Sequence, residues 1–151
     1  MAPHIMLVEA RYYAHISDEL AKGAIAALDA AGASYERFTV PGAFEIPAAI
    51  RIAIEARCHD VRRRFDGYVA LGCVIRGETT HYDYVCGESA RGLQQLALQY
   101  GAAIGFGILT VENEAQALAR ARVDRKNKGG EAARACLAMI ELKHQFGLYR
   151  S

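Results

Sequence analysis

The apolar run at residues 67–75 most limits how this chain can fold. A run without polar alternation is typical of a strand covered on both faces, and such strands occur mainly in parallel sheets. Shorter runs of strand type lie at 4–8, 35–40 and 103–110. The sequence therefore predicts a parallel sheet of four strands.

Segments with helical spacing separate these runs. Leu20, Ala24 and Leu28 recur on one helix face, with Ser17 as the expected N-cap and Gly32 as the stop. Further helices are expected from 45 or 46 to 57, over 81–100, from 113, and over 130–146. Because strands and helices alternate, we predict a single α/β domain over 1–151, with helices on both faces of the sheet.

Charge and cysteine usage narrow the class of protein. Eighteen basic and 17 acidic residues give a net charge of +1, so no strong field attracts nucleic acid or an anionic membrane. Four cysteines without CxxC spacing indicate reduced thiols. The N-terminal apolar run is broken by Glu9 and Arg11, which disfavours a signal peptide or a membrane span. We expect a cytoplasmic protein that binds neither nucleic acid nor membranes.

Ligands of open parallel sheets bind at the carboxyl ends of the strands. Four segments lie at these ends, at 11–13, 41–45, 73–81 and 110–113. Within the third, GCVIRGET nearly matches a phosphate-binding P-loop, but Glu78 stands where that motif needs lysine, which disfavours a nucleotide triphosphatase. A glycine loop before a helix can still hold a single phosphate at 77–80, although Gly77 could instead be only a turn residue.

His81 is the candidate general acid/base. It begins a predicted helix, whose dipole disfavours the imidazolium and leaves a neutral ring able to accept a proton. A lone histidine is nevertheless more often a surface or packed residue. Asp83 and Cys86 lie nearby without a convincing third ligand, so no metal site is expected.

Several other side chains can be interpreted either as ligand-binding residues or as ordinary structural residues. Glu45, in an apolar turn between two prolines, suits hydroxyl groups, or else it satisfies N–H groups at a helix start. The rings of Tyr12, Phe44 and Phe106 could stack on a flat heterocycle, although aromatics in strands and turns are usually core. The basic residues of 120–128 could equally be solvated.

Four motifs in one order resemble the lumazine synthases, a family of riboflavin-pathway enzymes. They are VPGAFEIP at 40–47, ALGCVIRGETTHYDYV at 70–85, GFGILTVEN at 105–113 and NKG at 127–129. The resemblance covers essentially the whole chain. It implies a flavodoxin-like three-layer sandwich, assembled as pentamers with active sites between neighbouring subunits.

The resemblance also implies a reaction. It joins 5-amino-6-(D-ribitylamino)uracil to 3,4-dihydroxy-2-butanone 4-phosphate and gives 6,7-dimethyl-8-ribityllumazine, phosphate and water. No metal and no organic cofactor would take part. The alternative is a paralogue that binds lumazine or riboflavin with little catalysis.

Residue by residue, the resemblance implies roles within one subunit. Substrate-binding positions for the pyrimidine and ribityl chain would be Tyr12, Ala43, Phe44, Glu45, Cys73, Val74 and Ile75. Tyr12 would stack on the pyrimidine, and Glu45 would accept hydrogen bonds from ribityl hydroxyls. Main-chain N–H groups of Glu78 and Thr79 would hold the phosphate, and His81 would transfer protons.

Three further roles would belong to the neighbouring subunit. Phe106 would lie against the pyrimidine, Lys128 would reach a pyrimidine carbonyl, and Arg120 would bind the phosphate, which suits its planar fork of donors. The sequence departs from the family at Tyr12, usually Phe or Trp, and at Glu78, usually a small residue. RVDRK at 122–126 replaces a glycine-rich turn of capsid-forming members, so we expect a pentamer or a dimer of pentamers.

Overall fold

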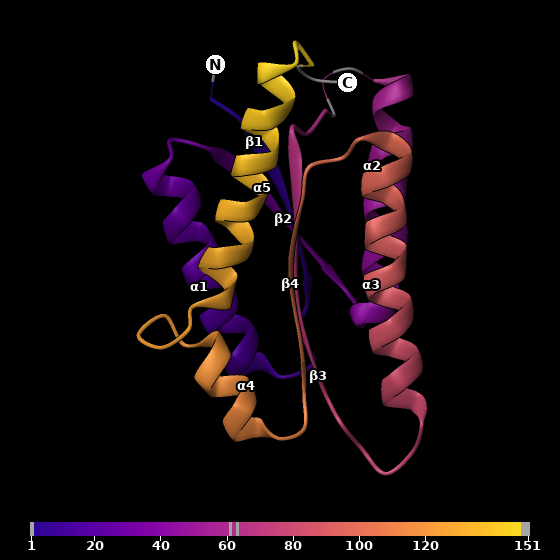
Figure 1. Ribbon diagram of the computed structural model, residues 1–151, viewed down its shortest axis with the longest axis vertical. Helices are drawn as coiled ribbons and strands as arrows, with labels where there is room; N and C mark the ends of the chain where they lie inside the picture. Colours follow the sequence, from indigo (N-terminus) through magenta and orange to yellow (C-terminus); the bar gives the residue numbers. More distant parts are fainter. Residues whose placement is uncertain (1, 61, 63, 149–151) are drawn as a thin grey trace.

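The computed structural model describes residues 2–60, 62 and 64–148. Its sheet has four parallel strands in the order β2-β1-β3-β4, namely β1 (His4–Ala10), β2 (Ser34–Val40), β3 (Gly67–Ile75) and β4 (Ile104–Val111). The helices are α1 (Ala14–Ala30), a 3₁₀ turn η1 (Ala43–Glu45), α2 (Ile46–His59), α3 (His81–Tyr100), α4 (Glu114–Ala121) and α5 (Lys128–Gln145). Helices α1, α4 and α5 cover one face of the sheet, and α2 and α3 cover the other (Figure 1). The predicted flavodoxin-like α/β sandwich is confirmed.

Strand β3 lies inside the sheet between β1 and β4. Val69 and Leu71 pack toward α1 and α5, whereas Tyr68 and Ala70 pack toward α2 and α3. The first seven residues of the strand are buried. The long apolar run therefore has the physical cause expected of it, because both of its faces are covered by helices.

Two helix starts differ from the predictions. Helix α1 begins at Ala14, so Ser17 is not its N-cap; Ser17 is buried in the first turn, and its hydroxyl donates to the Ala10 carbonyl at 3.4 Å. Helix α5 begins at Lys128 instead of residue 130, because the Asn127 side chain caps it by accepting from the Gly130 N–H at 3.2 Å. Helix α1 starts earlier because the Ser17 N–H already donates to the Tyr13 carbonyl at 2.9 Å.

Other boundaries are confirmed. Helix α2 starts at Ile46 after the 3₁₀ turn, with Pro47 in its first turn, where the missing N–H costs nothing. Gly32 follows α1 with φ +72°, a conformation that glycine adopts without strain. Helix α4 has Asn113 as its N-cap, which accepts from the Gln116 N–H at 2.9 Å. No helix in the described part of the chain is long and apolar enough to span a membrane.

Candidate active site

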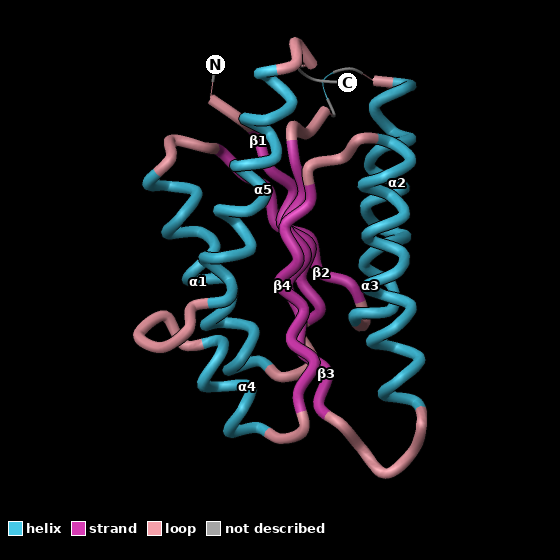
Figure 2. Tube along the Cα trace, in the orientation of Figure 1, coloured by secondary structure: helices cyan, strands magenta, loops and turns pink. Residues whose placement is uncertain are grey.

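A groove lies where the segments that follow β1, β2 and β3 meet, at the carboxyl ends of these strands. Its volume is about 600 Å³, and its lining residues are Tyr12, Tyr13, Gly42, Ala43, Phe44, Glu45, Cys73, Val74, Ile75, His81 and Val85. Figure 2 shows the connecting loops gathered at this end of the sheet. Three of the four predicted strand-end segments thus contribute to one groove, and the fourth, 110–113, does not line it.

Eight residues singled out from the sequence line this groove together, and three lining residues were not singled out. Tyr13 and Gly42 belong to the strand-end segments, so their position already indicated them. Val85 lies four residues after His81 in α3, and i, i+4 spacing on a helix would have found it.

The floor of the groove is apolar and its rim is aromatic. Ala43, Cys73 and Val85 are buried, whereas the rings of Tyr12 and Phe44 are 76% and 55% exposed. Burial, together with the nearby Cys86, raises the pKa of the Cys73 thiol to about 11. Cys73 is therefore a neutral wall residue at neutral pH and not a nucleophile.

His81 stands at the first position of α3, on the exposed side of the groove. Its backbone N–H donates to the Thr79 hydroxyl at 3.3 Å, and the N-cap residue Thr80 makes no side-chain capping bond. Within the described part of the chain, the imidazole forms no hydrogen bond, so it is available to a bound molecule.

Arg76 fixes the loop between β3 and α3. Its guanidinium lies over the Tyr82 ring, 4.3 Å from the centroid, and pairs with Glu112 at 2.7 Å and with Asp83 at 3.6 Å. The backbone N–H of Arg76 donates to the Val111 carbonyl at 2.9 Å. The charge of Arg76 is thus engaged by two carboxylates.

Glu78 and Thr79 are exposed in this loop and do not line the groove itself. They immediately precede α3, where the helix dipole is positive. The sequence interpretation did not single out Arg76 as the residue that anchors them. The sequence alone carried no signal for this role, because Arg76 meets Glu112 only through the register in which Ile75 pairs with Val111.

Three predicted residues lie outside the groove of this chain. Phe106 is 50% exposed on edge strand β4, on the face covered by α2 and α3. Arg120 of α4 donates to the Gln116 carbonyl at 3.1 Å, and the Lys128 ammonium at the start of α5 lies 3.1 Å from the Glu131 carboxylate. A single chain therefore does not bring these three side chains together with His81.

Among the described residues, no three His, Cys, Asp or Glu side chains are placed to hold a metal ion together. Asp83, considered with Cys86 in the sequence, pairs with Arg76.

Comparison with known proteins places the chain. Residues 2–144 match the model of the 6,7-dimethyl-8-ribityllumazine synthase family. The chain belongs to this family. It is similar to proteins named 6,7-dimethyl-8-ribityllumazine synthase from Sphingopyxis alaskensis, with 59% identity over 96% of this chain and 98% of that protein, and from Bartonella tribocorum, with 57% identity over 96% and 93%. The corresponding protein of Agrobacterium fabrum is 55% identical over 96% of this chain and 97% of its own.

Membership of the lumazine synthase family confirms the prediction made from the four motifs. The likeness covers almost the full length of each relative, so it includes all the segments that form the groove.

Proposed function

We propose that this chain is a transferase that joins 5-amino-6-(D-ribitylamino)uracil to 3,4-dihydroxy-2-butanone 4-phosphate, giving 6,7-dimethyl-8-ribityllumazine, phosphate and water. The observation that carries the proposal is the meeting of eight predicted residues in one groove of a member of the lumazine synthase family. The groove offers exposed aromatic rings, a carboxylate and a histidine, and the loop beside it offers exposed main-chain N–H groups at the start of α3, which are the groups that two such substrates require.

The pyrimidine binds between the rim and the floor of the groove. Tyr12 presents an exposed ring that can stack on a flat heterocycle, while its neighbour Tyr13 supports it with an edge contact at 4.9 Å between centroids. The backbone of Cys73, Val74 and Ile75 at the end of β3 offers the polar contacts. An apolar floor favours these contacts because it keeps water away from them.

The ribityl chain runs along the connection from β2 to α2. Ala43 and Phe44 line it, and Glu45 supplies the acceptor. The Glu45 carboxylate forms no hydrogen bond within the described residues and turns back toward Gly42, so it is open to ribityl hydroxyls. Its plain alternative, a carboxylate that caps α2, has no support, because Glu45 makes no side-chain capping bond.

The phosphate docks at the start of α3. Main-chain N–H groups of Glu78 and Thr79 and the positive end of the helix dipole face it, and a protruding Glu78 side chain is tolerable because only its backbone binds. Arg120 of a neighbouring subunit adds a charged fork. Phe106 and Lys128 of the same neighbour close the pyrimidine side.

His81 moves protons between the two substrates. It takes a proton as the pyrimidine amine attacks the ketone, and returns one as water leaves and the imine forms. It then takes the proton from the hydroxyl-bearing carbon beside the imine, and that C–H electron pair forms a C=C bond as the phosphate anion leaves with the C–O bonding electrons. The resulting enol becomes a ketone, which the ribitylamino nitrogen attacks, and a second water leaves as the ring closes. Holding two reactants side by side can contribute about 7 to 11 kcal/mol, so proton transfer is the smaller part of catalysis.

Neighbouring subunits complete the site, and we propose a homopentamer or a dimer of pentamers in the cytoplasm. A second apolar groove of about 550 Å³ lies between edge strand β2 and α2. Phe38 is 40% exposed and Ile52 67% exposed on its walls, which suits burial against another copy. The four cysteines are free, as expected of a reducing compartment.

The first experiment mixes the purified chain with both substrates and follows lumazine absorbance and phosphate release together. An enzyme-free control is needed, because the condensation also runs slowly unaided. A rate well above the control is expected. An unchanged rate combined with tight riboflavin or lumazine binding would instead favour the binding paralogue.

A second experiment tests the shared site. His81→Ala and Arg120→Ala chains are co-expressed and compared with each variant alone. If the site lies between subunits, some mixed interfaces combine an intact His81 with an intact Arg120, and activity returns. Activity no higher than that of the separate variants contradicts a site shared between subunits.

A further inference from the structure

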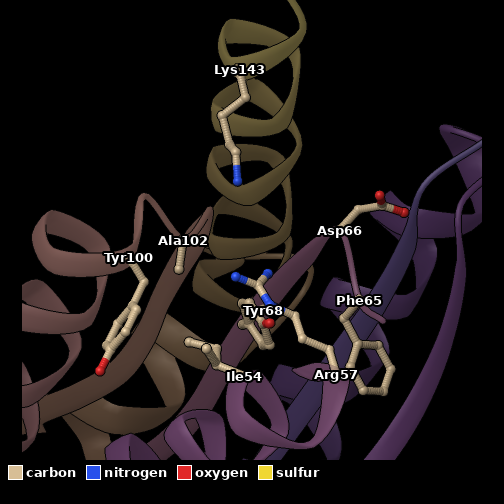
Figure 3. A pocket seen from close by; sticks show the side chains of 8 residues that line it. All are labelled: Ile54, Arg57, Phe65, Asp66, Tyr68, Tyr100, Ala102 and Lys143. Atoms are coloured by element: carbon tan, nitrogen blue, oxygen red, sulfur yellow. The ribbon is translucent and has the colours of Figure 1, made fainter. Parts of the chain in front are cut away.

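A small cavity lies at the opposite end of the sheet from the groove, where β3 begins and α2 and α5 end. Its walls include Tyr68, Asp66 and Lys143 (Figure 3). Its volume of about 10 Å³ is room for no more than a water molecule. A larger cluster of charges lies at the groove's own end of the sheet, around Glu9 near the carboxyl end of β1.

Glu9 is the only charged residue that is buried in the part of the chain that the structure describes, with 2% of its surface exposed. Its carboxylate accepts three hydrogen bonds. Arg37 of β2 donates from Nε at 2.7 Å and from Nη2 at 2.9 Å, and Arg11 donates from Nη1 at 2.9 Å. Apolar side chains of similar volume are often at least as stable in such a place, so stability alone does not explain a charged network here.

Arg11 connects this buried carboxylate to α1. Its Nη1 atom donates to Glu9, and its Nη2 atom donates to the Asp18 carboxylate. The hydrogen bonds to Asp18 and Glu9 raise the pKa of Arg11, although burial lowers it, so the guanidinium stays charged. The side chain of Arg11 is thus fixed at both ends of its fork, between the end of β1 and the helix that follows.

The next residue, Tyr12, faces the groove instead. It lines the groove with a ring that is 76% exposed, and a ring this exposed is placed mainly by the backbone that carries it. Ser17 holds the two ends of that segment, because its hydroxyl donates to the Ala10 carbonyl at 3.4 Å and its N–H to the Tyr13 carbonyl at 2.9 Å. Arg11 holds the middle.

We propose that Arg11, anchored on the buried carboxylate of Glu9, is a positioning residue that holds Tyr12 at the rim of the groove, where its ring stacks on a flat heterocycle. The inference rests on the proposed function, because that heterocycle is the pyrimidine substrate or the lumazine product. Arg11 touches neither molecule and acts through Tyr12. Binding costs less in this arrangement, since the ring is already in place when the ligand arrives.

Removing the charge of Arg11 tests the proposal. Arg11→Met keeps most of the side-chain length, and Glu9 stays paired with Arg37, so the fold is expected to survive. Calorimetry measures the Kd of 6,7-dimethyl-8-ribityllumazine and that of inorganic phosphate. The variant is expected to bind lumazine about fivefold more weakly, which is the value of one aromatic stacking contact. Phosphate, which docks at the start of α3, should bind as it does to wild type.

Arg37→Met is the matched control. It removes two hydrogen bonds from the same carboxylate, whereas Arg11→Met removes one, so it should lower the Tm at least as much. Arg37 lies within β2 opposite Leu7, outside the segment that carries Tyr12, and Arg11 still holds Glu9 in this variant. Its lumazine affinity should therefore stay close to that of wild type. If both variants lose lumazine affinity in proportion to their loss of Tm, the role of Arg11 is only structural and the proposal is overturned.

A double-mutant cycle decides whether Arg11 acts through Tyr12. In a Tyr12→Ala background the ring is gone, so adding Arg11→Met should leave lumazine affinity almost unchanged. Additive losses from the two substitutions would overturn the proposal. A crystal structure of Arg11→Met gives a measurement without ligand, in which the Tyr12 ring is expected to be displaced. A ring in its wild-type place would contradict the positioning role.

These measurements keep the reaction and the role of Arg11 apart, because binding is measured without turnover. A wild-type chain that binds lumazine but does not accelerate the condensation contradicts the proposed reaction alone. A wild-type chain that accelerates it, while Arg11→Met binds lumazine as tightly, contradicts the role of Arg11 alone.

Discussion

The two faces of the sheet are built differently. On the face covered by α1, α4 and α5, backbones approach so closely that a Cβ on Gly129 would meet the Leu20 carbonyl oxygen at 2.0 Å, and one on Gly105 would meet that of Ala132 at the same distance. On the face covered by α2 and α3, large side chains such as Phe38, Phe44 and Ile52 are exposed beside two open grooves.

This difference shows which face of the sheet has room for other molecules. Small residues let α1 and α5 pack closely on one face, so much of the core there is buried within a single chain. Larger residues on the other face leave gaps that substrates and neighbouring copies can fill. Arg120 and Lys128 link the two, because they belong to helices of the closed face but are proposed to act in the open groove of a neighbour.

The largest expected effect is that of replacing Arg120. Arg120→Ala should lower kcat/KM by about 10³, because the phosphate loses its charged fork. The free energy of unfolding should change little, since within the described part of the chain the Arg120 side chain bonds only to a carbonyl of its own helix. Steady-state kinetics with Arg134→Ala, an exposed arginine of α5, as control measures this. Near-normal activity would contradict a role of Arg120 in binding the phosphate.

Replacing His81 tests the groove on the open face without changing the closed one. His81→Ala should lower kcat by about 10² at saturating substrates and leave measurable turnover, because proximity provides most of the acceleration. His59→Ala, an exposed histidine near the end of α2, is the matched control. An unchanged kcat would remove His81 from the mechanism.

Cys73 lies where the two faces meet, since it packs in the closed core and lines the open groove. Burial raises its thiol pKa to about 11, so at pH 8 its thiolate is about 10² times scarcer than that of an ordinary thiol. Alkylation followed by mass spectrometry should label exposed Cys58 first. Labelling of Cys73 should keep rising toward pH 11. Equal rates at pH 8 would contradict its burial.

Glycine replacement compares the packing of the faces directly. Gly105→Ala forces a methyl group against the Ala132 backbone and should lower the free energy of unfolding by about 2 kcal/mol. Gly87→Ala meets open space on α3 and should be neutral or stabilising by up to about 1 kcal/mol. Urea unfolding of both measures the contrast. Equal free energies of unfolding for the two variants would mean that the backbone around Gly105 shifts at little cost to make room for the methyl group.

Short-range sequence patterns determined where several of the strands and helices of this protein lie. The apolar run of β3, the early Pro47 in α2 and the stop at Gly32 each express periodicity or backbone preference within a few residues, and four motifs sufficed to indicate the family. Most of the groove also followed, because parallel strands end at one edge and their next residues must meet there.

Tertiary structure decided what depends on partners distant in sequence. Ser17 is buried inside α1 and bonds to the end of β1 instead of capping the helix, and the pairing of Arg76 with Glu112 requires the register of β3 against β4. The convergence of Tyr68 and Lys143 likewise needs β3 and α5 packed together. Sequence periodicity says which face a residue occupies, but the side chain opposite it is set by packing between elements.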